Sequence, residues 1–244
     1  MKALIGFCGD AGAGKDSVAD FVEQWSMENN HKIYRTSFAQ PVYALTAAML
    51  GTTVDALAVR KTKEVKTRYK ITESTLIDMA DTFHFYELDR YNEFTDAWAM
   101  FQDYLEPYSD YGVQDDEDKG VFMDLFISPR KALELIGTEF GRLQLHENVW
   151  LDRVVQSSSY KDADLVLITD VRFENEAKFV NEQGTLIQIV STNATYKINS
   201  DHPSNQGVDP KFVNRAFVNT MEGLEKLGQD VKNFCNRFIA HLIK

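Results

Sequence analysis

The amino-acid sequence predicts an α/β fold in which a mostly parallel sheet is flanked by helices and carries a helical, acidic insertion. Three observations predict this class. Short apolar runs alternate along the chain with stretches of helical periodicity, the arrangement that places helices on the faces of a parallel sheet. The first apolar run leads directly into a glycine-rich loop and a helix. The length of 244 residues, 44% of them hydrophobic, suffices for one large domain with a substantial insertion.

The first elements follow from short stretches near the N-terminus. Residues 3–8, ALIGFC, form an apolar run that is typical of a buried parallel strand. From residue 14 to about residue 30, apolar side chains recur at helical spacing. Residues 32–38, KIYRTSF, predict a second strand, and Pro41 marks the first turn of the next helix.

The second half of the chain repeats this alternation. Residues 163–170 and 185–190 are apolar runs typical of strands, and the stretch between them, RFENEAKFVNEQG, has helical periodicity. Residues 215–219, RAFVN, predict a last strand, and a C-terminal helix follows it. These strands and helices complete the predicted core.

An acidic, aromatic-rich segment interrupts the pattern. Residues 73–118 hold fourteen acidic residues and one basic residue, a net charge of −13, which leaves +2 for the rest of the chain. Large apolar residues recur every three or four positions over 91–108, as on one face of a helix. This stripe either packs on the core or docks a second subunit to give a homodimer. We predict a folded insertion over 73–127, on the lid or acceptor side, between two parts of the core at 1–72 and 128–244.

Composition excludes several classes of protein. No apolar run approaches the roughly 20 residues that a membrane-spanning helix needs. The net charge of −11 argues against a general affinity for nucleic acid. Cys8 and Cys235 lack the spacing of metal ligands, so we expect buried thiols in a reducing, cytoplasmic environment.

Residues 6–17, GFCGDAGAGKDS, contain the pattern Gly-x-x-x-x-Gly-Lys between the first strand and the first helix. Glycines at such a point let backbone N–H groups converge on an anion at the N-terminus of a helix. We predict that Gly12, Ala13 and Gly14 hold the phosphates of ATP and that Lys15 reaches the β- and γ-phosphates. A purely structural glycine turn is the alternative.

The residue after this lysine departs from the usual pattern, which has a hydroxyl side chain as a ligand of Mg²⁺. Asp16 stands there, and Ser17 supplies a hydroxyl one position later. A carboxylate is also a hard oxygen ligand, which can hold the ion directly or through water. We therefore predict that Asp16 and Ser17 contribute to a Mg²⁺ site.

The segment GAGKDSVADF resembles the Gly-Lys-Asp form of this loop in bacteriophage deoxynucleoside monophosphate kinases. Other parts of the chain resemble that family in the same order, and together they cover about half of the chain. They are RKALELIGTEFGR (130–142), NVWLDRV (148–154), ITDVRFENEAKFVNEQGTLIQIV (168–190), DHPSNQGVD (201–209) and FVNTMEGLEKL (217–227). The resemblance implies a P-loop kinase that transfers the γ-phosphoryl group of ATP to a deoxynucleoside monophosphate (dNMP). The acidic insertion matches no motif of the family.

Three residues after the strand at 163–170 are candidates for the acceptor side. Asp170 ends that strand at the edge of the sheet where α/β proteins form their sites, where it could order Mg²⁺ or contact the acceptor. Capping of the next helix is the alternative interpretation, and the two roles are compatible. Arg172 and Glu176 are four residues apart, so a simple ion pair on a helix is one interpretation. The resemblance instead implies that Asp170, Arg172 and Glu176 surround the acceptor nucleotide and its phosphate.

Further candidates lie in the block at 130–142 and beyond. Arg130 and Lys131 begin a helix, where cations oppose the helix dipole unless an anion binds there. The resemblance implies that both contact the acceptor or the transferring phosphoryl group; surface cations are the alternative. Gly137 and Thr138 would offer close backbone approach and a hydroxyl, respectively.

Two more residues have a functional and a structural interpretation. Trp150 either stacks on a base, which stabilises binding by roughly 1–3 kcal/mol, or lies in the core. The run RKTKEVKTRYK, residues 60–70, is either a solvated helix face or, from its position in the family, a source of the phosphate contact Arg68.

The chain also departs from the family at two positions. Tyr43 stands where the family commonly has a lysine, which makes Lys131 or Arg68 more important or changes the choice of acceptor. Asn205 replaces a glutamate after His202 and Ser204, for which a structural role is expected. The departures concern specificity more than the type of reaction.

We predict a kinase that uses ATP and Mg²⁺ to phosphorylate a dNMP in the cytoplasm, of the host if it is phage-encoded. Its partners would be small molecules, without nucleic acid or membrane. A P-loop kinase for dephospho-coenzyme A or a sugar is one alternative, and a nucleotide-binding switch is another.

Overall fold

The structure, a computed structural model, describes residues 2–109, 120–192 and 207–243. The chain forms two compact units: Met1–Phe38 together with Val154–Lys244, and Ala39–Arg153. The predicted insertion over 73–127 lies within the residues of the second unit, and its bounds remain a prediction. The following paragraphs treat each unit by itself.

A parallel five-stranded sheet forms the centre of the first unit, as predicted. Its strands have the spatial order β2-β5-β1-β6-β7, and every neighbouring pair is parallel. They are β1 (Ala3–Cys8), β2 (Ile33–Thr36), β5 (Leu165–Ile168), β6 (Thr185–Ser191) and β7 (Arg215–Asn219). Because β1 lies in the middle and is buried along its whole length, it reads as a continuous apolar run.

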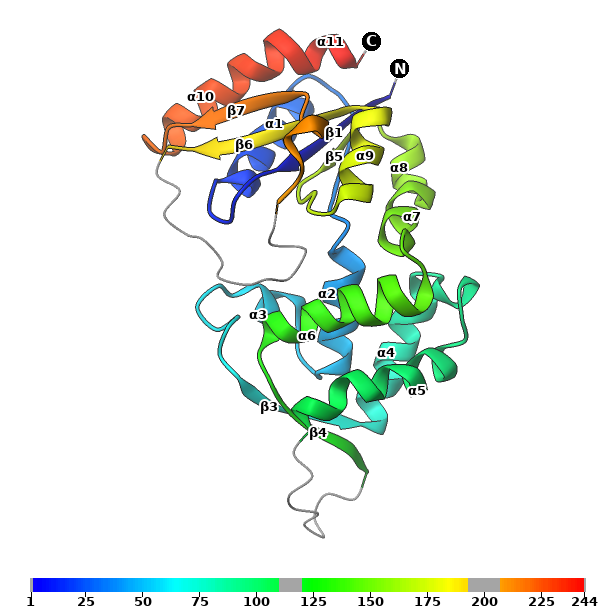
Figure 1. The fold of residues 1–244 in the computed structure, drawn as a ribbon. Helices are drawn as coiled ribbons and strands as arrows, with labels where there is room; N and C mark the ends of the chain where they lie inside the picture. The colour runs from blue at the N-terminus through cyan, green and yellow to red at the C-terminus, as the bar shows by residue number, and fades with distance from the viewer. Residues whose placement is uncertain (1, 110–119, 193–206, 244) are drawn as a thin grey trace. The chain divides into compact units, whose positions relative to one another are not determined.

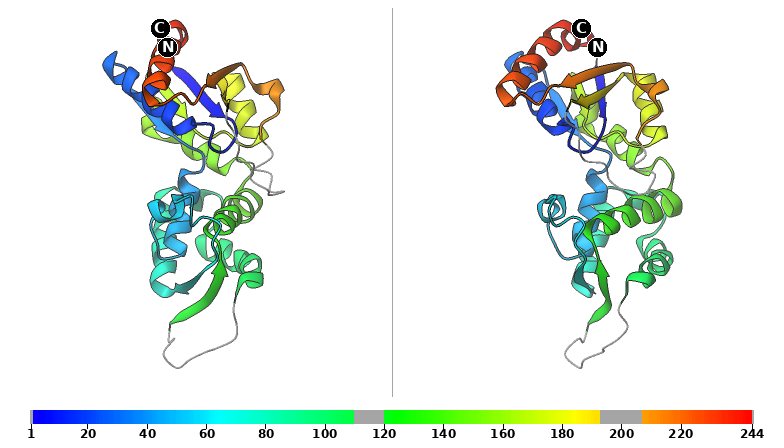
Figure 2. Two further views of the ribbon diagram at one scale, coloured as in Figure 1. Left: turned by 90° about the vertical axis from the view of Figure 1, so that its left-hand side faces the viewer. Right: turned by 60° about the vertical axis from the view of Figure 1, so that its left-hand side comes forward.

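Helices cover both faces of this sheet, as Figures 1 and 2 show. Helices α1 (Lys15–Glu28) and α10 (Leu224–Phe234) pack together on one face, and α9 (Glu174–Gln183) packs on the other, against β1 and β6. Alternate residues of β1, among them Ile5 and Phe7, enter the core beneath α1 and α10. The short helices α8 (Ser158–Asp162) and α11 (Ala240–Leu242) and the π-helical turn η6 (Cys235–Ile239) complete this unit.

The second unit is mostly helical. Its helices are α2 (Gln40–Met49), α3 (Val54–Ala58), α4 (Glu73–Phe85), α5 (Phe94–Leu105), α6 (Pro129–Leu135), the π-helical η3 (Ile136–Leu145) and the first part of α7 (Val149–Gln156). The short 3₁₀ turns η1 (Leu88–Arg90) and η2 (Glu106–Tyr108) flank α5. A third 3₁₀ turn, η5 (Pro210–Phe212), lies outside this unit, in the first one. Strands β3 (Thr67–Thr72) and β4 (Val121–Ile127) form a separate antiparallel pair.

The acidic segment packs its aromatic stripe inward, which confirms the first of the two interpretations. Trp98, Phe101 and Leu105 of α5 are buried, and the rings of Phe101 and Phe140 lie 5.1 Å apart at 67°. The stripe therefore belongs to the core of its own unit. The predicted homodimer remains a prediction.

The basic run 60–70 is not the solvated helix face that was one of its interpretations. Residues 67–70 instead lie in β3, and Arg68 is opposite Phe126 of β4. The partner strand is more than fifty residues away, so local periodicity within the run carries no signal of this pairing.

Two predictions from composition concern membrane-spanning helices and the burial of the cysteine thiols. Among the residues that the structure describes, no helix combines the length and apolar character needed to span a membrane. Cys8 and Cys235 are buried, as predicted. Burial raises the pKa of Cys8 to about 11, although Lys15 opposes the shift, and burial raises the pKa of Cys235 to about 12.

We expect neither cysteine to react with iodoacetamide in the native protein at pH 8. The thiolate is the reactive form, and a raised pKa keeps both thiols protonated until the pH approaches 11. Mass spectrometry should detect alkylation of both only after unfolding in urea. Rapid alkylation of the native chain would contradict the packing of β1 and η6.

Candidate functional site

The glycine-rich loop joins the central strand β1 to helix α1, the position that the sequence predicted. Gly9, Gly12 and Gly14 have φ angles of 134°, 84° and 90°, which L side chains rarely adopt. A β-carbon on Gly9 would stand 2.3 Å from the carbonyl oxygen of Ile189. The path of the loop therefore requires glycine for conformation and for space.

The loop leaves the N-terminus of α1 suited to an anion. Gly14 is the N-cap in a left-handed conformation, and no side chain in the described ranges caps the helix. The first N–H groups of a helix have no partner within it, and the helix dipole favours negative charge there. Ala13, within the loop, is buried, whereas Asp16 is exposed and Ser17 is partly buried in the first turn of α1.

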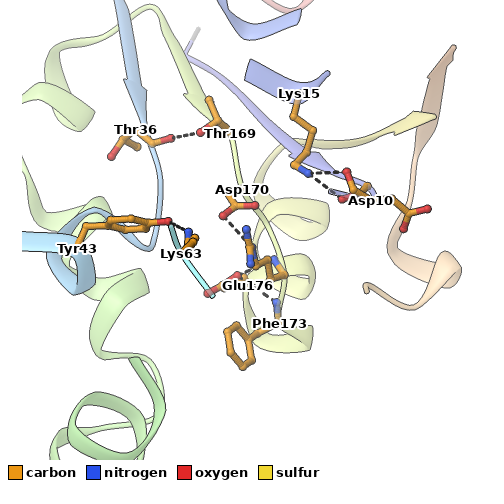
Figure 3. A network of polar contacts seen from close by, with 11 residues as sticks. Asp10, Lys15, Thr36, Tyr43, Lys63, Thr169, Asp170, Phe173 and Glu176 are labelled. Carbon is orange, nitrogen blue, oxygen red and sulfur yellow. Dashed lines mark hydrogen bonds and ion pairs between the residues drawn. The ribbon is translucent and has the colours of Figure 1, made fainter. Parts of the chain in front are cut away.

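The side chain of Lys15 folds back over the loop. Its ammonium group donates to the carbonyl oxygens of Gly9 at 2.8 Å and Asp10 at 3.1 Å, as Figure 3 shows for Asp10. Burial lowers the pKa of Lys15, and the negative charge of Asp170 opposes this shift. The lysine is thus held beside the amides with which it would share a phosphate.

Asp170 and Arg172 lie after β5, at the same edge of the sheet as the loop. Arg172 Nε donates to Asp170 Oδ2 at 2.8 Å, and both side chains are partly exposed. Helix α9 begins at Glu174 with Phe173 as its N-cap, so Asp170 is not the helix cap that was its alternative role. The structure brings together a carboxylate and a guanidinium group near Lys15.

Glu176 is hydrogen-bonded to the backbone just before α9. The residue is 3% exposed, and Oε2 accepts hydrogen bonds from the backbone N–H groups of Arg172 at 2.9 Å and Phe173 at 3.1 Å (Figure 3). It therefore fixes the start of α9, as a glutamate at the third helical position commonly does. Glu176 positions the backbone of Arg172, and its burial argues against direct contact with an acceptor.

Arg130 and Lys131 begin α6 in the second unit. Ser128 Oγ caps this helix by accepting the N–H of Lys131 at 3.3 Å. Arg130 forms an ion pair with Glu64, and its side chain is only 17% exposed. The Glu64 carboxylate thus partly neutralises the positive charge of Arg130, which a phosphate was expected to do.

A lysine that the sequence prediction did not single out lies beside Tyr43. Lys63 donates to the Tyr43 hydroxyl and lies 4.8 Å above the centre of its ring. The carbonyl of Lys63 also accepts the N–H of Arg130 at 2.9 Å. Tyr43 stands where the related family commonly has a lysine, so a positive charge reaches this place from another part of the chain. The basic run 60–70 was the available signal, but the sequence prediction chose Arg68 from its six cations.

Arg68 lies on the surface of the same unit. Its side chain is 60% exposed and reaches Asp124 of the paired strand at 3.5 Å. Ion pairs with this much exposure contribute about 0–1 kcal/mol to stability. The structure leaves the predicted phosphate contact untested.

Trp150 is in the core, the alternative that the sequence left open. The residue is 2% exposed, and Nε1 donates to the carbonyl oxygen of Gly137 at 2.8 Å. In this conformation the indole has no exposed face for a base, which corrects the base-stacking interpretation. Gly137 and Thr138 are partly buried in η3, the helix against which Trp150 packs.

The positions of possible metal-ligand side chains bear on the predicted Mg²⁺ site. Over the described ranges, no three histidine, cysteine or acidic side chains gather as a cluster of metal ligands. Magnesium is commonly held by one or two protein ligands together with substrate phosphates and water. An exposed carboxylate at Asp16 and a hydroxyl at Ser17 fit that kind of site. His202, Ser204 and Asn205 lie outside the described residues.

A second residue missed by sequence reasoning contacts the loop from β7. Asn219 is 4% exposed, and its Nδ2 donates to the carbonyl oxygen of Ala13 at 3.1 Å. The segment FVNTMEGLEKL contains this residue, but nothing in the sequence connects it to a loop more than two hundred residues earlier. Tertiary structure alone shows the contact.

Comparison with known proteins agrees with this geometry. No protein-family model matches the chain. The chain is 36% identical over 252 residues to the deoxynucleoside-5′-monophosphate kinase of Escherichia phage T5, and the match covers 100% of both chains. The similarity therefore extends through the acidic segment, where no motif was found.

We expect Gly141→Ala to destabilise the protein because its new β-carbon would lie 2.1 Å from the Trp150 ring. Overpacking against a buried ring costs typically 1–3 kcal/mol. Gly137→Ala on the same helix is the matched control, since its β-carbon would meet Val42 at 3.5 Å, an ordinary contact. Urea denaturation should show a lower free energy of unfolding for Gly141→Ala alone. Equal stability of the two variants would contradict this packing of Trp150.

Proposed function

This chain belongs to the family of deoxynucleoside-5′-monophosphate kinases, and we propose that it transfers the γ-phosphoryl group of ATP to a dNMP, giving ADP and a dNDP. The observation that carries the proposal is the glycine-rich loop, with Lys15 over it, at the end of the central strand β1. Similarity over the full length favours this activity over a kinase for another small molecule and over a nucleotide-binding switch.

The donor side of the proposed mechanism depends on the loop. The backbone amides of Gly12–Ser17 would surround the β- and γ-phosphates at the start of α1, where the helix dipole also attracts them. Lys15 would exchange its hydrogen bonds to the Gly9 and Asp10 carbonyls for bonds to these phosphates. Burial lowers the pKa of Lys15, and a bound anion would raise it again because a negative charge nearby favours the charged ammonium.

Asp16 and Ser17 are the residues that would hold Mg²⁺ beside the donor phosphates. The ion supplies neutralisation of phosphate charge when it is bound. Asp16 and Ser17 are adjacent on the first turn of α1, so the same backbone that binds the phosphates positions both groups.

Cations and hydroxyls on the acceptor side would bind and orient the dNMP. Arg172 would neutralise charge that develops on the transferring phosphoryl group, with Asp170 holding its guanidinium and Glu176 its backbone. We propose that Arg130 and Lys131 contact the acceptor phosphate. Lys63 would replace the lysine that the family commonly has at position 43.

Four further residues would have supporting parts in the acceptor region. The Thr138 hydroxyl would contact the acceptor, and Gly137 would allow its backbone to approach the acceptor closely. The exposed Arg68 would attract the acceptor phosphate by its positive charge. Trp150 would support this region by packing within it. We propose small molecules as partners and the host cytoplasm as the location, since ATP and dNMPs are found there.

The central experiment measures ADP release from Mg²⁺-ATP with each of dAMP, dGMP, dCMP, dTMP and AMP. We expect stimulation by one or more dNMPs, because the donor site requires an acceptor phosphate to complete the reaction. Lys15→Ala should abolish the stimulation, since the neutral variant cannot bridge the phosphates. Dephospho-coenzyme A, tested in place of the dNMP, represents the alternative class of acceptor. ATP binding without stimulation by any dNMP would contradict the proposal.

We expect Arg172→Ala to lower kcat by about 10²-fold or more, the usual effect of removing a group that stabilises transition-state charge. The unfolding free energy should fall by less than about 1 kcal/mol, because the lost ion pair with Asp170 is partly exposed.

Lys211→Ala is the matched control for this variant. Its ammonium forms a comparable surface pair with Asp209 at 2.8 Å and has no proposed part in the reaction. Wild-type kcat is expected for this control. Near-wild-type turnover of Arg172→Ala would remove Arg172 from the reacting groups.

A further inference from the structure

Asn219 is a buried polar side chain at the end of strand β7. It is 4% exposed, and its backbone pairs with Ser191 of β6 at the edge of the sheet where β1 passes into the glycine-rich loop. A buried amide costs free energy unless both its N–H and C=O groups are hydrogen-bonded. Each of its two polar atoms does have a partner, and the identity of these partners indicates its role.

The oxygen of this amide is fixed by the turn that follows β7. Asn219 Oδ1 accepts the N–H of Met221 at 3.1 Å. Met221 has a φ angle of 60°, a left-handed conformation that is uncommon outside glycine and asparagine. Because the oxygen faces an N–H donor, the nitrogen of the amide must face the other side.

On that other side lies the glycine-rich loop. Asn219 Nδ2 donates to the carbonyl oxygen of Ala13 at 3.1 Å. The amide also lies against the next residue, since a β-carbon on Gly14 would be 2.4 Å from Nδ2. Gly14 is therefore required for this close approach as well as for its φ of 90°.

We propose that Asn219 is a positioning residue for the donor phosphates, acting through the loop without touching the nucleotide. The hydrogen bond from Asn219 holds the Ala13 carbonyl oxygen toward β7. The negative end of this dipole then points away from the phosphate that the following N–H groups would bind. Preorganised amides bind an anion without first having to reorient. The inference rests on the proposed binding of ATP by the loop.

The Asn219→Ala and Asn219→Asp variants test this role in different ways. Alanine removes the donor and adds no charge. Aspartate keeps an oxygen for the N–H of Met221 but replaces the donor with a second oxygen, which would repel the Ala13 carbonyl. Asn214→Ala is the matched control, since Asn214 directly precedes the other end of β7 and its Oδ1 accepts the N–H of Leu186 at 2.7 Å.

The experiment measures the Kd for ATP by direct binding, the KM for ATP and for the dNMP, and the urea midpoint of each full-length variant. We expect both Asn219 variants to raise the Kd and KM for ATP about tenfold or more, with the KM for the dNMP within about twofold of wild type. Asn214→Ala should leave ATP affinity unchanged.

Three results would overturn the inference. The first is wild-type ATP affinity in a folded Asn219→Ala, and the second is weakened binding in the aspartate variant alone, which would indicate charge repulsion only. The third is an equal rise in both KM values. If instead wild-type protein fails to bind ATP and Lys15→Ala behaves identically, the proposed function itself fails.

Discussion

The passage from the buried strand β1 into helix α1 leaves no room for a side chain at Gly9 and Gly14, and the rest of the site depends on this constraint. The backbone must run within contact of the Ile189 carbonyl at Gly9 and of the Asn219 amide at Gly14. Only residues without a β-carbon satisfy both contacts. The chain consequently presents bare N–H groups at the N-terminus of a helix, and the lysine that begins the helix folds over them.

Ion pairs within the protein hold several of the proposed phosphate-binding cations before any substrate arrives. Arg172 is paired with Asp170, and Arg130 is paired with Glu64. Such partners limit the rotamers of long side chains, so less conformational entropy is lost when an anion binds. They also compete with that anion, which favours ligands carrying the high charge of a phosphate.

Several polar groups act on the backbone although their sequence context indicated contact with a ligand. Glu176 accepts hydrogen bonds from the backbone N–H groups just before α9, and the indole N–H of Trp150 donates to the carbonyl of Gly137. The cause is the same in both cases. A buried hydrogen-bonding group must be satisfied, and the nearest unpaired backbone group satisfies it. The resulting support is indirect: Glu176 holds the residue that carries the Arg172 guanidinium.

The sequence by itself determined the strands and helices of the first unit and its parallel sheet, because periodicity and glycine placement are local, whereas the spatial order of the strands came from the tertiary structure. The strand at 215–219 and the loop after residue 8 needed no information from elsewhere in the chain, and neither did the stripe on α5. The strands β3 and β4, the Lys63–Tyr43 contact and the Asn219–Ala13 contact were decided by tertiary structure. Each joins residues at least twenty positions apart, and local patterns hold no record of which distant group will satisfy a given donor or strand edge. Residue type determined what chemistry the chain can perform, and packing decided which side chains are left to perform it.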